Sequence, residues 1–370
     1  MCQNTGKLQD FILKSEKSVA ILGAGINIAD VRSEAIEFIE KLNIPTVLTY
    51  GGTDILPYNH PLYAGVVGIA GTYAANTAVQ NSDLIIAMGT RLSPNVTGGK
   101  QNLFAPQAKK VMIDIDKEEL TKFTSKEFLL DLAIHCDLKD FFKIKLKGKD
   151  NGKWLEIIKL WKDKYLICPS SYYESKKINP YVFVKELSLL SQSGDVITSD
   201  TGANLAWTMQ AWETKKDQKI ISAWNHTPMG YSLPAAIGAS FTTKENVICL
   251  IGDGGLMMCL QELATVVRHK LPIKIFVFNN HGHSIQKQTI ENWLQGNYQA
   301  VNEETGLSFP NFNIIATAFG IKHITLKSHE DIKIKLSYIL KSKFPILVNV
   351  EIDPDARIVP MIKFGQSLDE

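Results

Sequence analysis

Two short polar segments in the second half of the chain hold residue types that bind a metal ion and a phosphate. Residues 252–255 read Gly-Asp-Gly-Gly, and Asn279 and Asn280 follow further along the chain. Each segment ends an apolar run rich in β-branched residues, 246–251 in the first case and 272–278 in the second. Short apolar runs of this kind predict buried parallel strands.

The stretch between these strands predicts a helix that positions the two polar segments. Residues 260–269 place their apolar side chains on one helical face, so strand, helix and strand form a βαβ unit. Its right-handed crossover brings both strand ends to one edge of a parallel sheet. Asp253 and Asn280 then supply two oxygen ligands, which suit Mg²⁺, and the glycines expose backbone N–H groups, which suit a diphosphate. The spacing therefore predicts a site for a magnesium diphosphate.

The wider sequence around these segments resembles a known family. Gly-Asp-Gly and Asn-Asn at this spacing are similar to the cofactor motif of thiamine-diphosphate (ThDP) enzymes. Residues 225–239 (NHTPMGYSLPAAIGA) and 199–207 (SDTGANLAW) resemble the acetolactate synthase and pyruvate decarboxylase superfamily, in particular the acetolactate synthase large subunit. The resemblance runs from about residue 15 to the C-terminus. The alternative is a glycine turn and a chance asparagine pair in an ordinary nucleotide-binding fold.

The resemblance implies specific roles for residues around the cofactor. The Mg²⁺ ligands would be the side chains of Asp253 and Asn280 and the backbone carbonyl of Gly282. Met229 matches the bulky apolar residue on which the cofactor bends, although methionine also suits plain core packing. The carbonyl of Thr227 would accept the aminopyrimidine N–H. The cofactor-binding set implied by the resemblance is Gly202, Ala203, Asn204, Thr227, Met229, Gly252, Asp253, Gly254, Gly255, Asn280, Gly282 and Ile285, whereas Asn279 is expected to hold the turn.

The segment after the asparagine pair faces the substrate in the resembled family and distinguishes its branches. Gln286 takes the place of a proton-transferring glutamate of the decarboxylases, and glutamine cannot transfer a proton at neutral pH. Thr289 stands where acetolactate synthases have a tryptophan. The sequence therefore matches neither branch fully and is nearer to carboligase-like members, with Met229, Thr227 and Gln286 at the reaction centre.

Two loop histidines are further candidates for acid or base chemistry. His281 and His283 follow Asn280 closely, and histidine changes its charge near neutral pH. A histidine on a loop is more often simply solvated, so both interpretations stay open.

A second glycine turn near the start of the chain suggests a nucleotide. Gly23, Gly25 and Ala29 stand at the glycine positions of the dinucleotide fingerprint. The next strand lacks the acidic residue that an NAD-binding fold places at its end, which weakens an NAD-dependent oxidoreductase as an alternative. In the acetolactate synthases this domain binds a non-redox FAD. Arg91 is retained in the matching segments and Asn95 replaces a second basic position, so FAD stays open but is not favoured.

The pattern of elements predicts an α/β chain with two doubly wound parallel-sheet domains. Residues 1–170 would form a central domain, and residues 171–370 the ThDP diphosphate-binding domain. A helix whose first turn contains Pro180 opens the second domain. The predicted strands are 18–26, which runs into a glycine turn, and 44–49, 82–89, 109–116, 194–200, 246–251, 272–278 and 344–352.

The overall composition is ordinary for a soluble globular protein. The 370 residues are 45% hydrophobic and 21% charged with a net charge of +2, which gives no electrostatic argument for nucleic acid or a membrane surface. No apolar run approaches the ~20 residues of a membrane span. The cysteines Cys2, Cys136, Cys168, Cys249 and Cys259 lack paired metal-ligand spacing, so we expect free thiols and a cytoplasmic location.

These observations together predict a ThDP- and Mg²⁺-dependent carboligase. It would decarboxylate a 2-oxo acid such as pyruvate and join the remainder to a carbonyl acceptor. The resembled family carries its cofactor-activating glutamate on a pyrimidine-binding domain, which the 370 residues do not match. We therefore expect a homo-oligomer with a partner chain that supplies this domain, and very low activity without it. The alternatives are a simple 2-oxo acid decarboxylase and a truncated, non-catalytic ThDP-binding subunit.

Overall fold

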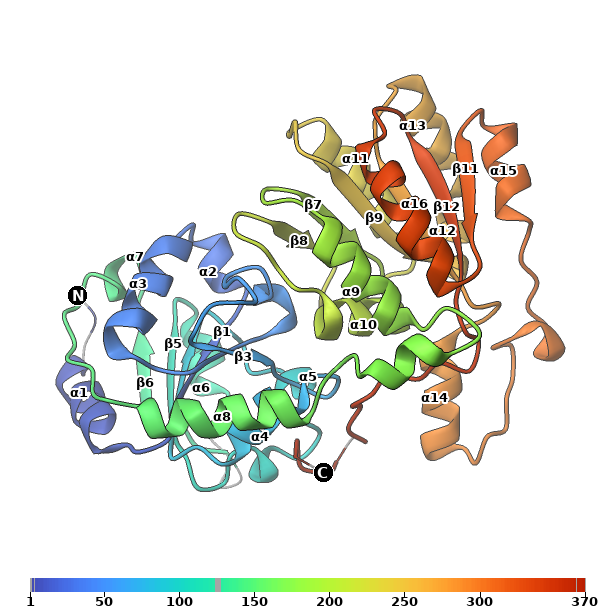
Figure 1. Cartoon of the computed structure of the whole chain (residues 1–370). Coiled ribbons are helices and arrows are strands. Elements are labelled where there is room, and N and C mark those ends of the chain that lie inside the picture. Colours follow the sequence, from blue (N-terminus) through green and yellow to red (C-terminus); the bar gives the residue numbers. More distant parts are fainter. Residues whose placement is uncertain (1, 3, 124–127, 364, 370) are drawn as a thin grey trace. The chain divides into compact units, whose positions relative to one another are not determined.

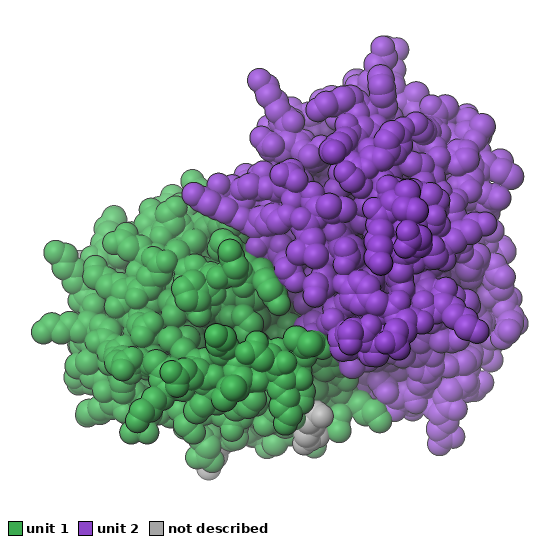
Figure 2. Space-filling model, in the orientation of Figure 1, with its two compact units in different colours: residues 1–166, 360–370 green, residues 167–359 purple. Residues whose placement is uncertain are grey.

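The computed structural model describes residues 2, 4–123, 128–363 and 365–369. They form two compact units, Met1–Leu166 with Pro360–Glu370 (unit 1) and Ile167–Val359 (unit 2), coloured separately in Figure 2. Each unit holds a six-stranded sheet, and all strand pairs described in both sheets are parallel (Figure 1). The predicted α/β class with two parallel-sheet domains is confirmed.

The sheet of unit 1 has the strand order β3-β2-β1-β4-β5-β6, which is also the order of the dinucleotide-binding fold. Its strands are β1 Ser18–Leu22, β2 Thr46–Leu48, β3 Tyr63–Val66, β4 Leu84–Met88, β5 Lys109–Asp114 and β6 Leu132–His135.

Apolar side chains cover both faces of this sheet. Along β1 and β4, alternate residues belong to two separate buried clusters, one on each face. Leu22 lies in the first cluster and Ile21 in the second, and both are fully buried. Burial on both faces explains why the inner strands are continuous apolar runs in the sequence.

The helices of unit 1 connect consecutive parallel strands or flank them. They are α1 Thr5–Lys14, α2 Gly25–Ile28, α3 Arg32–Leu42, α4 Tyr73–Gln80, α5 Pro94–Thr97, α6 Lys117–Thr121, α7 Leu138–Phe141 and α8 Gly152–Lys164, with 3₁₀ turns at Tyr50–Gly52 and Gln101–Leu103.

The sheet of unit 2 has the order β11-β12-β10-β9-β7-β8. The chain order reverses between β7 and β9, and the crevice outside the carboxyl ends at such a reversal is the usual ligand site of an open α/β sheet. The strands are β7 Val196–Ser199, β8 Lys219–Ile221, β9 Val247–Gly252, β10 Lys274–Asn279, β11 Lys322–Leu326 and β12 Ile346–Glu351.

The first helix of unit 2 begins as its sequence predicts. Pro180 occupies the first turn of α9, and Oδ1 of Asn179 caps the helix by accepting a hydrogen bond from the N–H of Tyr181 (2.9 Å). The helix expected over 260–269 is a 3₁₀ turn, Leu260–Glu262, followed by α13. None of the described helices is long and apolar enough to cross a membrane. The helices of unit 2 are α9 Pro180–Leu190, α10 Ala203–Ala211, α11 Ser232–Ser240, α12 Asp253–Met258, α13 Leu263–Arg268, α14 Ser284–Trp293, α15 Phe312–Ala318 and α16 His329–Lys341, with further 3₁₀ turns at Ser170–Glu174 and Glu303–Thr305.

The C-terminal tail belongs to unit 1, whereas the sequence assigned it to the second domain. The N–H of Ile362 donates to the carbonyl of Ile69 (2.8 Å), and Nε2 of Gln80 donates to Oγ of Ser367 (2.5 Å). Leu368 is buried in one of the two clusters of unit 1. A strand-free tail with one buried apolar side chain has no periodic pattern that would indicate where it packs.

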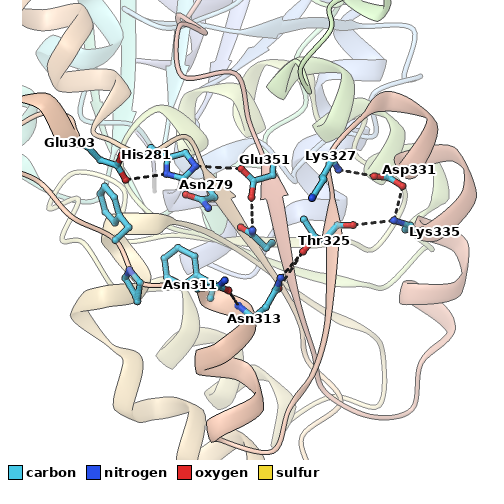
Figure 3. A pocket seen from close by; sticks show the side chains of 14 residues that line it. Asn279, His281, Glu303, Asn311, Asn313, Thr325, Lys327, Asp331, Lys335 and Glu351 are labelled. Carbon is cyan, nitrogen blue, oxygen red and sulfur yellow. Dashed lines mark hydrogen bonds and ion pairs between the residues drawn. The ribbon is translucent and has the colours of Figure 1, made fainter.

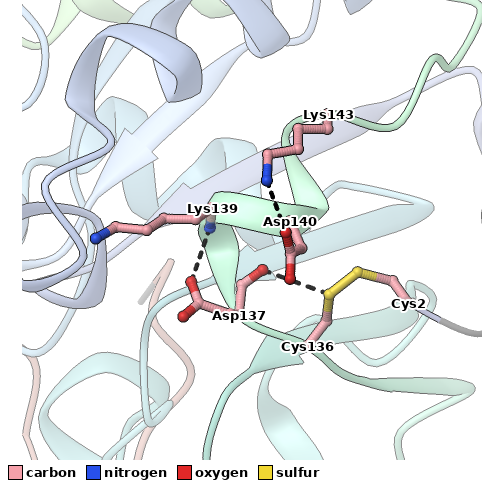
Figure 4. The surroundings of a disulfide bond; sticks show 6 residues. All are labelled: Cys2, Cys136, Asp137, Lys139, Asp140 and Lys143. Atoms are coloured by element: carbon pink, nitrogen blue, oxygen red, sulfur yellow. Dashed lines mark hydrogen bonds and ion pairs between the residues drawn. A yellow bond between two sulfur atoms is a disulfide. The ribbon is translucent and has the colours of Figure 1, made fainter.

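The prediction that all five cysteines are free thiols is wrong for one pair. Cys2 and Cys136 form a disulfide, with Cα atoms 5.3 Å apart, between the N-terminal segment and the residue after β6 (Figure 4). Their separation of 134 residues gives no sequence signal, because pairing depends on how the chain folds. Cys168, Cys249 and Cys259 are free thiols.

Candidate cofactor site

The carboxyl ends of β9 and β10 lie side by side and hold the residues that the sequence singled out. The strands pair in parallel, with Gly252 opposite Phe278. Just beyond them, Oδ2 of Asp253 accepts hydrogen bonds from the N–H groups of Asn280 (3.2 Å) and Gly282 (3.3 Å). The Asp253 carboxylate therefore joins the two loops at one edge of the sheet, as the βαβ prediction requires.

The side-chain amide of Asn280 meets two oxygen atoms beside this carboxylate. One end of the amide lies 3.2 Å from Oδ2 of Asp253 and 2.9 Å from the carbonyl oxygen of Gly282. Without a cation, the NH₂ group at that end donates to both oxygens, and turning the amide over presents its oxygen to a bound cation instead. Octahedral Mg²⁺ with oxygens at roughly 2.0–2.1 Å places adjacent ligands about 2.9–3.0 Å apart. The separations here are close to those of adjacent ligands of one such ion.

Burial makes the ionised form of the Asp253 carboxyl unfavourable when no cation is bound to it. The residue is 2% exposed, and burial raises the pKa of its carboxyl to about 6, although the N–H of Gly254 donates to Oδ1 at 2.6 Å. A bound cation offsets the cost of burying the charged carboxylate. Among the residues that the structure describes, no group of three or more histidine, cysteine or acidic side chains could hold a metal ion. One carboxylate with amide and carbonyl oxygens suits Mg²⁺ rather than a transition metal.

Gly254 and Gly255 leave no room for side chains. A Cβ atom on Gly254 would lie 2.6 Å from Cε1 of His283 and 2.9 Å from Cε of Met229. A Cβ atom on Gly255 would lie only 1.9 Å from Oδ2 of Asp200. Side chains from three other segments thus crowd the backbone at the start of α12, and a side chain at either position would have to displace one of them.

The loop after β7 lies beside the loop after β9. A Cβ atom on Gly202, whose φ is +90°, would lie 3.7 Å from Oδ1 of Asn204 and 4.0 Å from Cγ2 of Ile285. A Cβ atom on Gly252 would lie 3.8 Å from the same oxygen of Asn204. The structure therefore brings Gly202, Asn204, Gly252 and Ile285 together, and Ala203 is buried at the start of α10.

Asp200 was not among the residues expected from the sequence, yet its carboxylate holds a second part of the site. Oδ2 accepts a hydrogen bond from the N–H of Gly230 (3.1 Å), and Oδ1 accepts from those of Tyr231 (2.9 Å) and Ser232 (3.4 Å). Burial raises the pKa of Asp200 above its ordinary range despite these hydrogen bonds. An acidic residue directly after a buried strand is the sequence signal that could have found it.

Met229 and Thr227 lie on the loop that Asp200 anchors. Met229 is 38% exposed, and its Cε approaches Gly254 as described above. That exposure does not fit plain core packing. Thr227 is exposed and has a φ of +40°, a left-handed conformation that is uncommon for a β-branched residue. Backbone strain of this kind clusters at ligand sites.

Helix α14 places Ile285 and Gln286 differently. Ile285 is half-buried beside Gly202, whereas Gln286 is exposed. The helix is fixed further along by Glu291, whose carboxylate accepts two hydrogen bonds from Arg357, from Nε (2.8 Å) and Nη2 (2.6 Å). Such a bidentate pair restricts the orientation of the helix.

The two histidines have different surroundings. His281 is about half exposed, with its ring nitrogens 3.4 Å from carboxylate oxygens of Glu303 and Glu351. The ring of His283 contacts the Gly254 region and lies 6.4 Å from the ring of Phe309. Burial lowers the pKa of His283, which favours its neutral form.

In unit 1 the glycine turn has a packing explanation. A Cβ atom on Gly23 would lie 2.5 Å from the carbonyl oxygen of Gly89, and one on Gly25 would lie 2.6 Å from the Cα of Gly89. The two glycines therefore permit close contact with the segment after β4. Arg91 forms an ion pair with Glu119 (3.3 Å). These contacts account for the glycines without a nucleotide, and FAD binding stays a prediction.

Comparison with protein families bears on both units. Residues 200–350 match the family described as thiamine pyrophosphate enzyme, C-terminal TPP binding domain, and residues 6–143 match the central domain of the same enzymes. The chain belongs to the thiamine pyrophosphate enzymes. Thiamine pyrophosphate is another name for ThDP, so the family agrees with the resemblance stated from the motifs.

Several curated proteins resemble nearly the whole chain. A probable acetolactate synthase large subunit of Methanocaldococcus jannaschii is 34% identical over 98% of this chain and 62% of its own length. The large subunit of acetolactate synthase isozyme 2 of Escherichia coli is 32% identical, over 98% and 64% respectively. The mitochondrial acetolactate synthase catalytic subunit of Saccharomyces cerevisiae is 30% identical, over 100% and 55%. The chain thus spans less than two thirds of the length of these relatives.

The part of the chain that matches the TPP binding domain includes the candidate site of unit 2. The matched TPP binding domain, 200–350, contains every cofactor-binding residue that the motifs implied. The structure brings most of these residues to the carboxyl ends of β7, β9 and β10.

Proposed function

We propose that unit 2 binds ThDP through Mg²⁺ and that the protein works as a 2-oxo acid decarboxylating carboligase of the acetolactate synthase type. The observation that carries the proposal is the convergence of the Asp253 carboxylate, the Asn280 side-chain amide and the Gly282 carbonyl, whose three oxygens can face one ion, inside a matched TPP binding domain. Relatives that cover nearly the whole chain are named acetolactate synthases, which supports the carboligase.

Different residues of the chain would hold the metal ion, the diphosphate and the rings of the cofactor. The three oxygens would bind Mg²⁺, and the backbone around Gly254 and Gly255 would approach the diphosphate, with Gly202 and Asn204 on its other side. Met229 would support the bent cofactor, and the carbonyl of Thr227 would orient its pyrimidine. The bound cofactor supplies the electron sink that accepts negative charge when a 2-oxo acid loses CO₂.

Gln286 favours the carboligase over a simple decarboxylase. A decarboxylase of this family needs a proton at the carbon left after CO₂ departs, and the amide of Gln286 cannot supply one at neutral pH. Half-buried His283 is a candidate for this proton transfer, because an imidazole that takes up a proton from solvent can donate it to that carbon, although burial lowers the pKa of His283 and opposes the charged form. A decarboxylase is the second candidate function for that reason.

We further propose that a pyrimidine-binding domain completes the site. The two family models match a central and a C-terminal domain, and the curated relatives extend beyond the part that this chain matches. In the proposed assembly, copies of this chain form a homo-oligomer, and a different polypeptide that carries the pyrimidine-binding domain joins them. The substrates would be a 2-oxo acid such as pyruvate and a carbonyl acceptor.

The cytoplasmic location expected from the sequence remains a prediction. The three free cysteines agree with a reducing compartment. The Cys2–Cys136 disulfide is instead typical of an oxidising one, so it removes part of the support for the prediction.

Product analysis tests the proposed activity. The purified chain is incubated with pyruvate, ThDP and Mg²⁺, alone and after co-expression with a polypeptide that carries a pyrimidine-binding domain. We expect acetolactate from the co-expressed preparation and turnover well below about 1 s⁻¹ from the chain alone, set against ordinary enzyme rates. Acetaldehyde as the main product would contradict the carboligase. Ordinary turnover by the chain alone would contradict the need for a further domain.

A further inference from the structure

A polar cavity of about 610 Å³ lies in unit 2 at the carboxyl ends of β10, β12 and β11 (Figure 3). Its wall includes Asn279 from β10, Asn349 and Glu351 from β12, and Thr325 from β11. The volume falls in the range of small-molecule sites, roughly 300–1,000 Å³, and the carboxyl edge of a parallel sheet is where such sites usually lie. The proposed magnesium ligands are not part of this wall.

Two buried amide oxygens in this wall have no hydrogen-bond partner. Asn279 is 5% exposed and Asn349 is 7% exposed, and Oδ1 of each is unpartnered in the part of the chain that the structure describes. In the parallel register Val277 lies opposite Asn349, and Asn279 opposite Glu351. The two asparagines therefore lie on the same face of neighbouring strands, two residues apart in register.

Several other polar groups around the cavity are already engaged. Nδ2 of Asn349 donates to Oε1 of Glu351 (2.7 Å), and Nδ2 of Asn313 donates to Oγ1 of Thr325 (2.8 Å). On the far side, Nζ of Lys335 lies 2.6 Å from Oδ1 of Asp331. Among the described residues that line the cavity, the fully buried side-chain nitrogen and oxygen atoms without a partner are these two acceptors.

The charge around these acceptors favours a cationic donor. Glu351 lies directly beside Asn349, and Glu303 also lines the cavity, with His281 3.4 Å from a carboxylate oxygen of each. The lysine on the opposite wall, Lys335, is neutralised by Asp331, and Lys327 lies exposed. Burying an unsatisfied polar group is unfavourable, so two of them on one wall point to a ligand that satisfies both.

We propose that this cavity binds a small metabolite through a primary ammonium group, which donates hydrogen bonds to Oδ1 of Asn279 and Oδ1 of Asn349. An ammonium group has three N–H donors and no acceptor, so it can satisfy both oxygens and also face Glu351. The site is separate from the proposed cofactor site and does not depend on ThDP binding.

Three probes of one size distinguish this proposal from a water-filled cavity. Ethanolamine, ethylene glycol and glycolate carry a cationic, a neutral and an anionic group on the same two-carbon frame. In saturation-transfer NMR with the full chain, we expect ethanolamine to bind at least tenfold more tightly than either of the others. Equal signals from all three would indicate a cavity that holds water only, and tighter binding of glycolate would indicate an anion site; either result would overturn the proposal.

Substitutions then place the binding in this cavity. Asn349→Leu removes both polar atoms with little change in size, so we expect ethanolamine to bind at least tenfold more weakly while the melting temperature does not fall. Asn313→Leu is the matched control, because its amide is already paired with Thr325 and the affinity should change less than threefold. If Asn349→Leu does not fold, Asn349→Ala serves the same purpose. Unchanged ethanolamine binding in a folded Asn349 variant would overturn the proposal.

Discussion

Replacement of Asp200 by asparagine tests how the loop that carries Met229 is held. Asp200 presents two oxygens to three backbone N–H groups, whereas asparagine keeps a single oxygen. If that oxygen stays with Tyr231 and Ser232, the new NH₂ group faces the N–H of Gly230, and a buried donor loses its acceptor. An unsatisfied buried donor costs about 1–3 kcal/mol.

A second effect of Asp200→Asn opposes this loss of stability. Burial raises the pKa of Asp200, so part of the cost of its charge disappears in the neutral variant. We therefore expect Asp200→Asn to lose about 1–2 kcal/mol of stability in urea unfolding at pH 7, the lower part of that range. If the loop must be ordered to hold the cofactor, the Kd for ThDP with Mg²⁺ rises about tenfold, since 1.4 kcal/mol is a factor of ten.

Asp195 provides the matched control. It is equally buried, burial also raises its pKa, and it accepts hydrogen bonds from the N–H of Gln192 (2.7 Å) and from Asn246 (3.1 Å). It precedes β7, at the end of the strand away from the site. Asp195→Asn should cost similar stability and leave ThDP affinity unchanged. Equal ThDP affinity in the Asp200 variant and the native chain, or equal loss in both variants, would refute the reasoning.

Three further predictions concern the same site. Met229→Ala should keep metal-dependent ThDP binding in calorimetry but lose carboligation in the completed enzyme, and a lower melting temperature without ligand would instead indicate core packing. In metal-free protein the folded-state pKa of Asp253, about 6, exceeds its ordinary value of 3.8, so its favourable contribution is complete below pH 3.8 and is lost as the pH rises through 6. Relative to Asp253→Asn, the native chain should lose about 2–2.5 kcal/mol between pH 4 and 7 in urea unfolding with a chelator, and a pH-independent difference would contradict the shift. Gly255→Ala places a methyl group against Asp200 and should abolish ThDP binding. Gly238→Ala is the control and should not change ThDP binding, because a Cβ atom there has no neighbour within 4 Å. Equal ThDP binding by both variants would show that neighbouring groups move to relieve the crowding at Gly255.

The inner strands of both sheets could be predicted from the sequence, and the edge strands could not. The eight predicted strands are the four central ones of each sheet, where burial on both faces produces continuous apolar runs. The four strands without a prediction, β3, β6, β8 and β11, are the sheet edges. β11 begins with exposed Lys322 and His323, and β6 alternates buried and exposed residues over only four positions. Such short, half-exposed segments resemble loops in a single sequence.

Some residues of the candidate site could likewise be predicted from the sequence, and others could not. Asp253 and Asn280 could be placed together because each directly follows a predicted strand of one βαβ unit. Asp200 could not be assigned to the loop at 230–232, because that contact joins segments 30 residues apart with no periodic pattern between them. The orphaned oxygens of Asn279 and Asn349 depend on which strands are neighbours, and β12 pairs with β10 only in the folded sheet. Sequence order gives strand ends, but the packing that completes a site is visible only in three dimensions.

The central claim is that Asp253 anchors ThDP through Mg²⁺, and titration calorimetry tests it most directly. ThDP is titrated into the native chain and into Asp253→Ala, each with Mg²⁺ and with a chelator, and the melting temperature of each protein confirms that it is folded. We expect metal-dependent binding by the native chain and loss of that dependence in the variant. Unchanged ThDP affinity in folded Asp253→Ala with Mg²⁺ present would contradict the account.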